Sequence, residues 1–240
     1  MTNGERAARI DEVRRRLHRD GPPWTRGQGL DFETVSLPRP DCDLLRDLLV
    51  AERAETVVEI GLAYGSSALA IGEALSTVGS ARPRQVVIDP FQQSIWSNVG
   101  WDLLRDAGLD RVATQIEAES STALPGLLAE GLVADAAFVD GSHRFHEVFV
   151  DLYFLRRIVR PGGLVVLDDH WAPSVRTAVA YYERNLGWER IPDPFPGGSR
   201  QHIGNDPGAA LVDRCAAFRV PEPGDDPPFT AFRSFWTERP

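Results

Sequence analysis

Short apolar segments alternate with amphipathic ones through the middle of the chain. Between positions 56 and 169 the apolar runs are TVVEIG, RQVVIDP, ATQIEAES, AAFVDGS and GLVVLDD. Short runs rich in valine and isoleucine are typical of strands covered on both faces, as in a parallel sheet with crossover helices. The intervening segments have apolar residues at helical spacing, over about 66–75, 101–107, 124–130, 145–159 and 174–185. This alternation predicts a doubly wound α/β domain.

The two ends of the chain have other patterns. We expect one helix at about 5–19 and a second that Asp41 caps. Beyond the last long helix, GWERI and AAFRV are candidate strands, and the Gly/Pro-rich segment 192–208 between them is expected to be a loop or lid. The final twenty residues are Pro-rich but aromatic, so we expect them to dock on the chain itself or on a second subunit. Their aromatic side chains are Phe229, Phe232, Phe235 and Trp236.

The composition narrows the class of partner. Hydrophobic residues make up 42% of the 240 and charged residues 25%, which is ordinary for a globular protein. No run approaches the ~18 apolar residues of a membrane span, and the N-terminus lacks the apolar stretch of a signal peptide, so we expect a cytoplasmic protein without a membrane partner. A net charge of −9 opposes binding to nucleic acid and favours a small-molecule partner. All basic residues are arginine, which excludes a catalytic lysine.

A glycine-containing turn follows the first predicted strand. The sequence VVEIGLAYGSS places Glu59, Gly61 and Gly65 there, just before a helix that begins at Ser66. Glycines permit close backbone approach, and a free helix N-terminus attracts negative groups. A nicotinamide or flavin site would need the spacing GxGxxG, which this turn lacks. An acid two residues before the first glycine suits a cationic ligand instead.

Three aspartates follow two of the predicted strands. Asp140 ends the fourth strand, and Asp168 and Asp169 end the fifth. Because neighbouring carboxylates repel each other and resist desolvation, some partner must compensate for them. If the two strands are neighbours, the three acids converge on one rim, which suggests a hard divalent cation, most simply Mg²⁺. The alternative is that these acids contact a cofactor or cap helices without a metal.

Two histidines near these acids are candidate catalytic residues. His143 lies three residues after Asp140, and an imidazole titrates near neutral pH, so His143 is a candidate general base. His170 directly follows the aspartates and could ligate a metal, bind the substrate or act as an alternative base.

The segment ExGxxxGxS, from Glu59 to Ser67, is similar to motif I of class I S-adenosylmethionine-dependent methyltransferases. Over roughly residues 41–190 the chain resembles their small-molecule O-methyltransferase branch, which implies a mostly parallel, seven-stranded, Rossmann-like sheet and S-adenosylmethionine (SAM) as cofactor. In that family the residue at Glu59 lies near the methionyl amine, the glycine loop lines the amino-acid half and Asp89 takes the ribose hydroxyls. The resemblance implies these cofactor-binding residues: Glu59, Gly61, Tyr64, Gly65, Ser66, Ser67, Asp89, Asp140 and, at the adenine, Glu119 and Ser120.

The resemblance also bears on the metal. Catechol-type and macrolide-sugar O-methyltransferases hold a divalent ion with an acid at the position of Asp140 and an acid paired with an acid or amide at Asp168 and Asp169. Catechol-type relatives have a lysine where this chain has His143, whereas the sugar-modifying relatives have histidine. The predicted metal ligands are therefore Asp140, Asp168 and Asp169, and the predicted catalytic residues are His143, Asp140 and His170.

The predicted function is SAM-dependent, Mg²⁺-assisted transfer of a methyl group to a hydroxyl of a small molecule, either a natural product or a sugar. We expect an N-terminal helical cap (1–40), a methyltransferase domain (41–220) and an aromatic tail (221–240) that suggests a homodimer. One alternative is a metal-independent methyltransferase that acts on a carboxylate, a nitrogen or a peptide terminus. Another is a non-catalytic, cofactor-binding partner protein.

Overall fold

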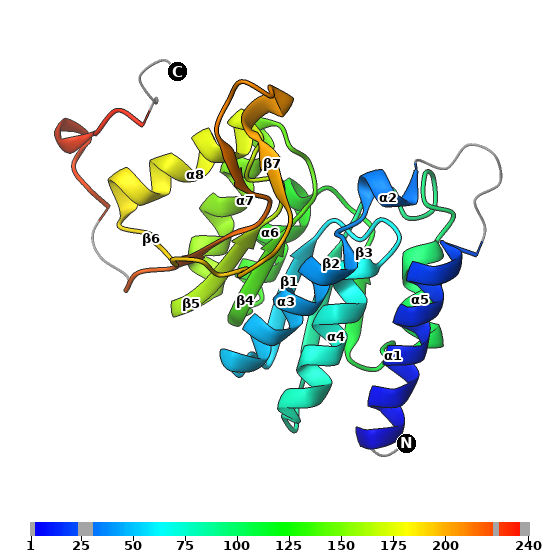
Figure 1. Cartoon of the computed structure of the whole chain (residues 1–240). Helices are drawn as coiled ribbons and strands as arrows, with labels where there is room; N and C mark the ends of the chain where they lie inside the picture. The colour runs from blue at the N-terminus through cyan, green and yellow to red at the C-terminus, as the bar shows by residue number, and fades with distance from the viewer. Residues whose placement is uncertain (1–2, 24–30, 223–225, 236–240) are drawn as a thin grey trace. The chain divides into compact units, whose positions relative to one another are not determined.

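The computed structural model describes residues 3–23, 31–222 and 226–235 (Figure 1). Trp236 of the predicted tail and residues 24–30 of the N-terminal connection lie outside this part. The α-helices are α1 Asn3–Asp20, α2 Phe32–Val35, α3 Arg39–Ala51, α4 Ser66–Val78, α5 Val99–Asp106, α6 Ser120–Ala129, α7 Phe145–Ile158 and α8 Pro173–Leu186. The strands are β1 Thr56–Ile60, β2 Arg84–Ile88, β3 Ala113–Ile116, β4 Ala134–Val139, β5 Val159–Leu167, β6 Glu189–Arg190, β7 Arg200–His202, β8 Leu211–Asp213 and β9 Ala216–Arg219.

Seven strands form a sheet in the order β3-β2-β1-β4-β5-β9-β6. Strands β1, β2 and β3 pair in parallel, as do β4 and β5, whereas β9 is antiparallel to both β5 and β6. The inner parts of the parallel strands are buried, as their continuous apolar sequences predict. The predicted α/β fold with a mostly parallel seven-stranded sheet is confirmed. The candidate strands in GWERI and AAFRV are present as β6 and β9, which pair with each other.

The segment 192–208, which was predicted to be a loop, is partly ordered as a strand. Strand β7 pairs antiparallel with β8, with His202 opposite Leu211, and a short 3-10 turn follows at Ile203–Asn205. The Gly/Pro-rich composition hid this hairpin because its strands have three residues each, too few for a period-2 pattern.

The chain divides into two compact units, residues 1–123 and 124–240. In the first unit, α4 packs on β1 and β2, and α1, α3 and α5 pack against α4 (Figure 1). Helix α1 buries Ile10, Val13 and Leu17, which lie on one helical face. Its buried Arg14 forms ion pairs with Asp43 and with Glu73, so this helix is anchored by both apolar and charged contacts.

In the second unit, α7 packs on β4 and β5, and α8 packs against α7. The C-terminal segment docks on these two helices: Phe235 is stacked at 6.4 Å on Phe145 and lies edge-on at 5.4 Å from Tyr181. The side chain of Asn185 also accepts a hydrogen bond from the backbone N–H of Arg233 at 2.7 Å and donates one to its carbonyl at 3.0 Å. The described part of the tail thus binds the chain's own body.

None of the described helices combines the length and the apolar character needed to cross a membrane.

Candidate active site

The turn after β1 has the backbone geometry that its glycines suggested. Gly61 has a φ of +93° and donates its backbone N–H to the Ile88 carbonyl at 2.9 Å. Gly65, at φ +82°, directly precedes α4, and a Cβ at this position would lie 3.2 Å from the Gly100 carbonyl oxygen. The left-handed conformation therefore favours glycine at position 65, and a side chain there would also press against Gly100.

Asp89, which was predicted to bind the ribose, is the centre of a hydrogen-bond network. Its carboxylate accepts the backbone N–H groups of Leu62 at 3.0 Å and Ala63 at 2.9 Å, and that of Phe91 at 2.8 Å. The Gln92 side-chain amide donates to it at 3.0 Å. With only 3% of its surface exposed, Asp89 ties the glycine loop to the end of β2, and its role toward a ribose stays a prediction.

Glu59 has internal partners as well. Its carboxylate is fully buried and accepts hydrogen bonds from the Ser67 hydroxyl at 2.7 Å and the Gln85 amide at 3.0 Å. These contacts link β1, β2 and the first turn of α4. They place Ser67 within the framework of the loop, and a direct contact between Glu59 and a methionyl amine stays a prediction.

Ser66 differs from these residues, because its hydroxyl is buried without a hydrogen-bond partner among the described residues. It is the first residue of α4, whose N-terminus has no side-chain cap. Tyr64, by contrast, packs edge-on against Phe32 and Trp96, with ring centroids 5.9 and 5.1 Å away. The predicted adenine-contacting pair lies at the start of α6, where Glu119 is exposed and Ser120 is the first helical residue.

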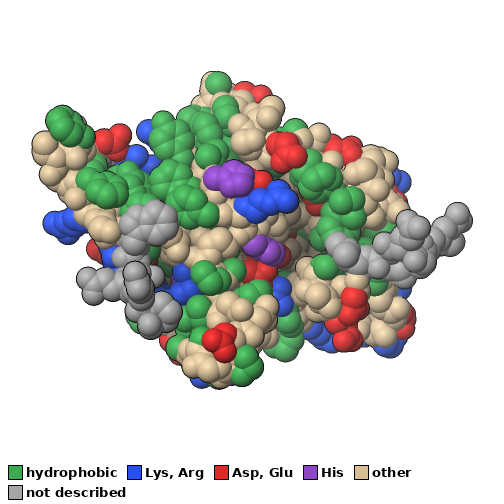
Figure 2. Space-filling model, turned by 90° about the horizontal axis from the view of Figure 1, so that it is seen from above, with side chains coloured by type: hydrophobic (Ala, Val, Ile, Leu, Met, Phe, Trp, Pro, Cys, Tyr) green, Lys and Arg blue, Asp and Glu red, His purple; other side chains and the backbone are tan. Residues whose placement is uncertain are grey.

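The second unit brings Asp140, His143 and Asp169 together. Strands β4 and β5 pair in parallel up to Val139 and Leu167, so the residues that follow both strands lie at one rim. His143 Nε2 is 3.0 Å from an Asp169 oxygen and 3.6 Å from an Asp140 oxygen. Ligand atoms of all three residues lie within 4.8 Å of one another, which is compatible with a shared metal ion. Figure 2 shows histidine side chains next to arginine and acidic ones on the face seen from above.

Asp168 does not join this group, although it was predicted to be a metal ligand. Its carboxylate is completely buried and accepts hydrogen bonds from Arg214, at 2.7 Å from Nη2 and 2.9 Å from Nε. The Cys215 thiol donates to it at 3.3 Å. The described geometry therefore gives Asp168 the role of charge partner to Arg214, and its role as a metal ligand stays a prediction without a contact that supports it.

A turn after β5 directs Asp169 toward His143. Asp169 has a φ of +48°, which is unusual for a residue with a side chain, and its carbonyl accepts the backbone N–H of Ala172 at 2.8 Å. The indole N–H of Trp171 donates to the second carboxylate oxygen at 2.7 Å. Local strain of this kind is often found at functional sites.

The charges of this cluster perturb one another. Burial, together with the charge of Asp168, raises the pKa of Asp140 to about 7. Burial alone would raise the pKa of Asp169, but the hydrogen bond from His143 and the charge of Arg214 hold it below its usual value. The neighbouring carboxylates of Asp140 and Asp169 in turn raise the pKa of His143 to about 10. In the absence of a cation this shift favours the protonated ring, whose nearer charge partner is Asp169 at 3.0 Å.

His170, the other candidate catalytic histidine, lies in the interior. Only 3% of its surface is exposed, its ring lies 6.2 Å from that of Phe218, and its Nδ1 is 3.3 Å from an Arg176 nitrogen. Burial and the nearby charge of Arg176 lower its pKa to about 3. Its described contacts are structural, so a catalytic role for His170 stays a prediction that these contacts do not favour.

Arg214 was missed by the sequence analysis although it lies at the rim. It precedes β9 by two residues, and β9 runs antiparallel to β5, with Ala216 opposite Leu167. The residues before β9 must therefore meet the residues after β5. The sequence predicted the AAFRV strand, which follows Arg214 closely. Placing Arg214 at the rim also required the direction in which that strand pairs with β5, which the sequence does not give.

Comparisons with known proteins agree with this fold. Residues 58–170 match the family model described as a methyltransferase domain. The structure is similar to the O-methyltransferase TomG from Streptomyces achromogenes, involved in tomaymycin synthesis and solved in complex with SAM, at 18% identity over 90% of both chains and a TM-score of 0.60. Cofactor-bound Rv0187 from MTB is 17% identical over 91% of both chains, with a TM-score of 0.62. An O-methyltransferase from Bacillus cereus, in complex with SAH, is 14% identical over 88% of this chain and 90% of that one, with a TM-score of 0.58.

No curated protein matches the chain in sequence. At the identities found, the likeness to solved structures establishes the fold, and residues 58–170 are similar to a methyltransferase domain. The predicted resemblance to methyltransferases is therefore confirmed, and the chain has the fold of the solved O-methyltransferases that it resembles.

Proposed function

We propose that this protein is a SAM-dependent O-methyltransferase that transfers a methyl group to a hydroxyl of a small molecule with the help of a divalent cation. The observation that carries the metal-assisted part is the cluster of Asp140, His143 and Asp169 at the ends of two adjacent strands. The neighbouring folds contain proteins solved with SAM or SAH, which supports SAM as the cofactor of this chain.

The glycine loop of the first unit fits the amino-acid half of SAM. The unpartnered Ser66 hydroxyl and the uncapped N-terminus of α4 can both hydrogen-bond a carboxylate. Asp89 and Glu59 hold the two ends of this loop in place through their buried hydrogen bonds. In this proposal they act on the cofactor partly by fixing the backbone that binds it.

The acidic cluster fits a divalent cation. Two carboxylates alone suit Mg²⁺, whereas participation of His143 suits Mn²⁺ or another ion that accepts imidazole. A cation held there supplies stabilisation of the acceptor oxygen as it loses its proton. Trp171 and the strained turn at Asp169 keep the carboxylate oriented, and the Ser174 hydroxyl, which donates to the His143 carbonyl at 2.5 Å, fixes the loop that carries the histidine.

In the proposed reaction the acceptor oxygen attacks the sulfonium methyl group in line, the carbon–sulfur bond breaks and S-adenosylhomocysteine leaves. The hydroxyl proton passes to a base, for which His143 stays the candidate. The two neighbouring carboxylates favour the protonated ring, so His143 must first release a proton before it can accept one from the substrate.

A second candidate function is metal-independent methyl transfer to a carboxylate or an amine. One observation favours it: both carboxylate oxygens of Asp169 already have donors within the chain, Trp171 and His143. In that case Asp169 and His143 form an ion pair that needs no metal ion, and the carboxylate orients the His143 ring. The homodimer, the acceptor type and the division into residues 1–40, 41–220 and 221–240 are likewise proposals.

The test is transfer of the labelled methyl group of SAM to a panel of acceptors, with catechols, sugar hydroxyls, carboxylates and amines represented. The proposal predicts labelled hydroxyl products that disappear with a chelator and return with Mg²⁺ or Mn²⁺. Transfer to hydroxyls that a chelator leaves unchanged would contradict the metal-assisted part, and labelling of carboxylates or amines alone would support the second candidate.

A further inference from the structure

We propose that a pocket at the start of β5 is a second ligand site, which binds an organic anion with an apolar body. This inference goes beyond methyl transfer, because the pocket lies at the end of β5 opposite to the aspartates. Strand β5 pairs with β4 from Val159 opposite Ala134 to Leu167 opposite Val139, so the two ends are roughly 17 Å apart.

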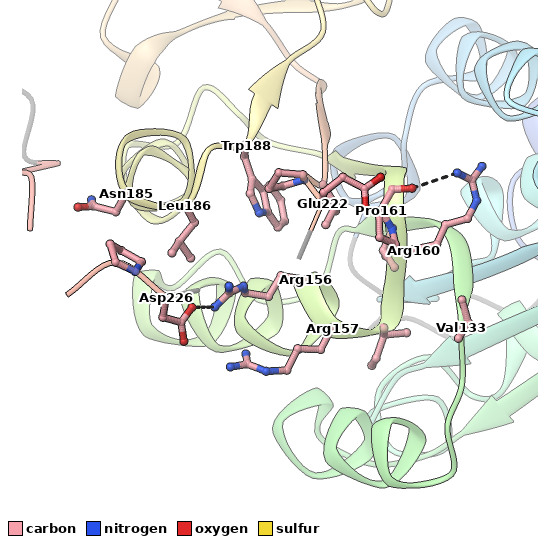
Figure 3. A pocket seen from close by; sticks show the side chains of 15 residues that line it. Val133, Arg156, Arg157, Arg160, Pro161, Asn185, Leu186, Trp188, Glu222 and Asp226 are labelled. Carbon is pink, nitrogen blue, oxygen red and sulfur yellow. Dashed lines mark hydrogen bonds and ion pairs between the residues drawn. The ribbon is translucent and has the colours of Figure 1, made fainter. Parts of the chain in front are cut away.

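The pocket lies within the second unit and has a volume of about 710 Å³. Its walls come from the end of α7, the start of β5, the end of α8 and the segment after β9 (Figure 3). Apolar side chains make up much of the lining, among them Ile158, Leu186 and Val220. A cavity of this size with apolar walls and a few polar groups is typical of small-molecule sites.

One polar group in this pocket has no partner. Trp188 is 3% exposed, and its indole N–H makes no hydrogen bond with the described residues. Its ring packs 5.1 Å from that of Tyr182, and Figure 3 shows the indole extending toward the side of the pocket where Arg156 lies. A buried donor without an acceptor is costly, so a ligand oxygen at this position would satisfy it.

The charged lining favours an anion. Three arginines, Arg156, Arg157 and Arg160, line the pocket together with two acids, Glu222 and Asp226, so the lining carries one more positive than negative charge. Arg157 is directed to Tyr153, with its guanidinium 4.0 Å from the ring centroid, and Arg160 pairs with Asp135 at 2.8 Å.

Arg156 is the arginine that a ligand can recruit. Its side chain is 21% exposed, and its one ionic partner in the described structure is Asp226 at 2.8 Å (Figure 3). Asp226 itself is 64% exposed, so this pair is weak and readily exchanged. The carboxylate of Asp226 shows where an anionic group can bind, and the acid group of a ligand can take its place at Arg156.

These features define the class of ligand. Its acid group pairs with Arg156, an oxygen accepts the Trp188 N–H, and an aromatic or alkyl body covers Leu186 and Val220. A bare inorganic anion would leave the apolar walls unfilled. We therefore expect an aryl or alkyl carboxylate, sulfonate or phosphate ester.

The test uses 8-anilinonaphthalene-1-sulfonate, an aromatic sulfonate whose fluorescence rises on binding, titrated into the full chain in the presence of excess SAM. We expect saturable binding that Arg156→Gln and Trp188→Phe each weaken about tenfold, because each removes a hydrogen bond to a charged group. Asp226→Asn should strengthen binding, because it removes the competing carboxylate. Arg105→Gln is the matched control: this exposed arginine also pairs with an aspartate but lies in the first unit.

Equal affinities of the wild type and Arg156→Gln, or the absence of saturable binding, would overturn the proposal. Because the ion pair of Arg156 is with the mostly exposed Asp226, its loss should affect folding little. The test therefore does not depend on the buried Trp188. Displacement of the probe by inorganic phosphate at similar concentrations would also contradict it, since it would show that the apolar walls contribute nothing.

Discussion

Asp168 and Asp169 are neighbours in sequence and yet have different partners. Asp168 is completely buried against Arg214, whereas Asp169 turns, through its left-handed backbone, toward His143 and Trp171. Two adjacent buried carboxylates would repel each other, and the structure gives each its own hydrogen-bond donors. The charge of Arg214, 3.7 Å from an Asp169 oxygen, also compensates the second carboxylate. The pair is thus divided into one carboxylate that stabilises the fold and one that is available to the site.

The first prediction concerns the carboxylate that stabilises the fold. Asp168→Asn should lower the free energy of unfolding by about 3 kcal/mol, because it leaves a nearly buried guanidinium without its counter-charge. Urea denaturation measures this. In Asp102→Asn, where both partners of the ion pair are mostly exposed, the loss should stay under about 0.5 kcal/mol. Similar losses in both variants would contradict the assigned role of Arg214.

The second prediction separates binding from loop support. Ser66→Ala should weaken SAM binding several-fold and leave the free energy of unfolding unchanged, since its hydroxyl makes no hydrogen bond within the described chain. Asp89→Ala should reduce both, with a stability loss of about 3 kcal/mol, because buried N–H groups of the loop lose their acceptor. Calorimetric SAM titration and urea denaturation measure the two quantities. A Ser66→Ala variant with wild-type affinity would contradict the proposed placement of the cofactor.

At the scale of elements, the sequence predicts the strands and helices of the parallel core more completely than it predicts the residues of the site. The βα alternation predicted the strands and long helices, since buried strands and amphipathic helices leave strong periodic signals. It also placed Asp140 and Asp169 together, because adjacent parallel strands end at one edge. The partner Arg214 could not be inferred in the same way, since it lies 46 residues beyond Asp168 and its position depends on the antiparallel direction of β9. The two-residue β6 and three-residue β7 give almost no signal by themselves.

The third prediction tests the packing of α5 against the glycine loop. A Cβ at Gly100 would lie 2.5 Å from the Ala63 carbonyl oxygen and 2.8 Å from Leu62 Cγ. Gly100→Ala should therefore displace the loop, lower the thermal unfolding midpoint and weaken SAM binding. In Gly126→Ala, a helical glycine with open space around its added Cβ, stability should instead rise by about 0.5–1 kcal/mol. A Gly100→Ala variant that binds SAM normally would show that this contact does not shape the loop.

At the scale of the whole molecule, His18 makes stability depend on pH. Burial and the charge of Arg14 lower the pKa of His18 from 6.5 to about 4 in the folded chain. Between these values the unfolded chain binds a proton that the folded chain does not, so the free energy of unfolding falls as the pH drops from 6.5 toward 4.

The fourth prediction follows from that difference. Over this pH range the wild type should lose on the order of 1 kcal/mol more stability than His18→Gln, because partial solvent exposure screens the effect. Urea denaturation of both proteins at pH 4.5 and 7 measures it, and subtracting one from the other cancels the groups that they share. Parallel pH profiles would contradict a buried, neutral His18.

The central claim is that the chain binds SAM and a divalent cation, the latter through Asp169. The most direct measurement is calorimetric titration of the metal-stripped protein with SAM, and then of the complex with Mg²⁺ or Mn²⁺, for the wild type, Asp169→Asn and the control Asp102→Asn. We predict SAM binding in all three and a cation isotherm that only Asp169→Asn abolishes. SAM binding without any cation isotherm would contradict the metal-assisted mechanism, and the absence of SAM binding in the wild type would contradict the proposed function as a whole.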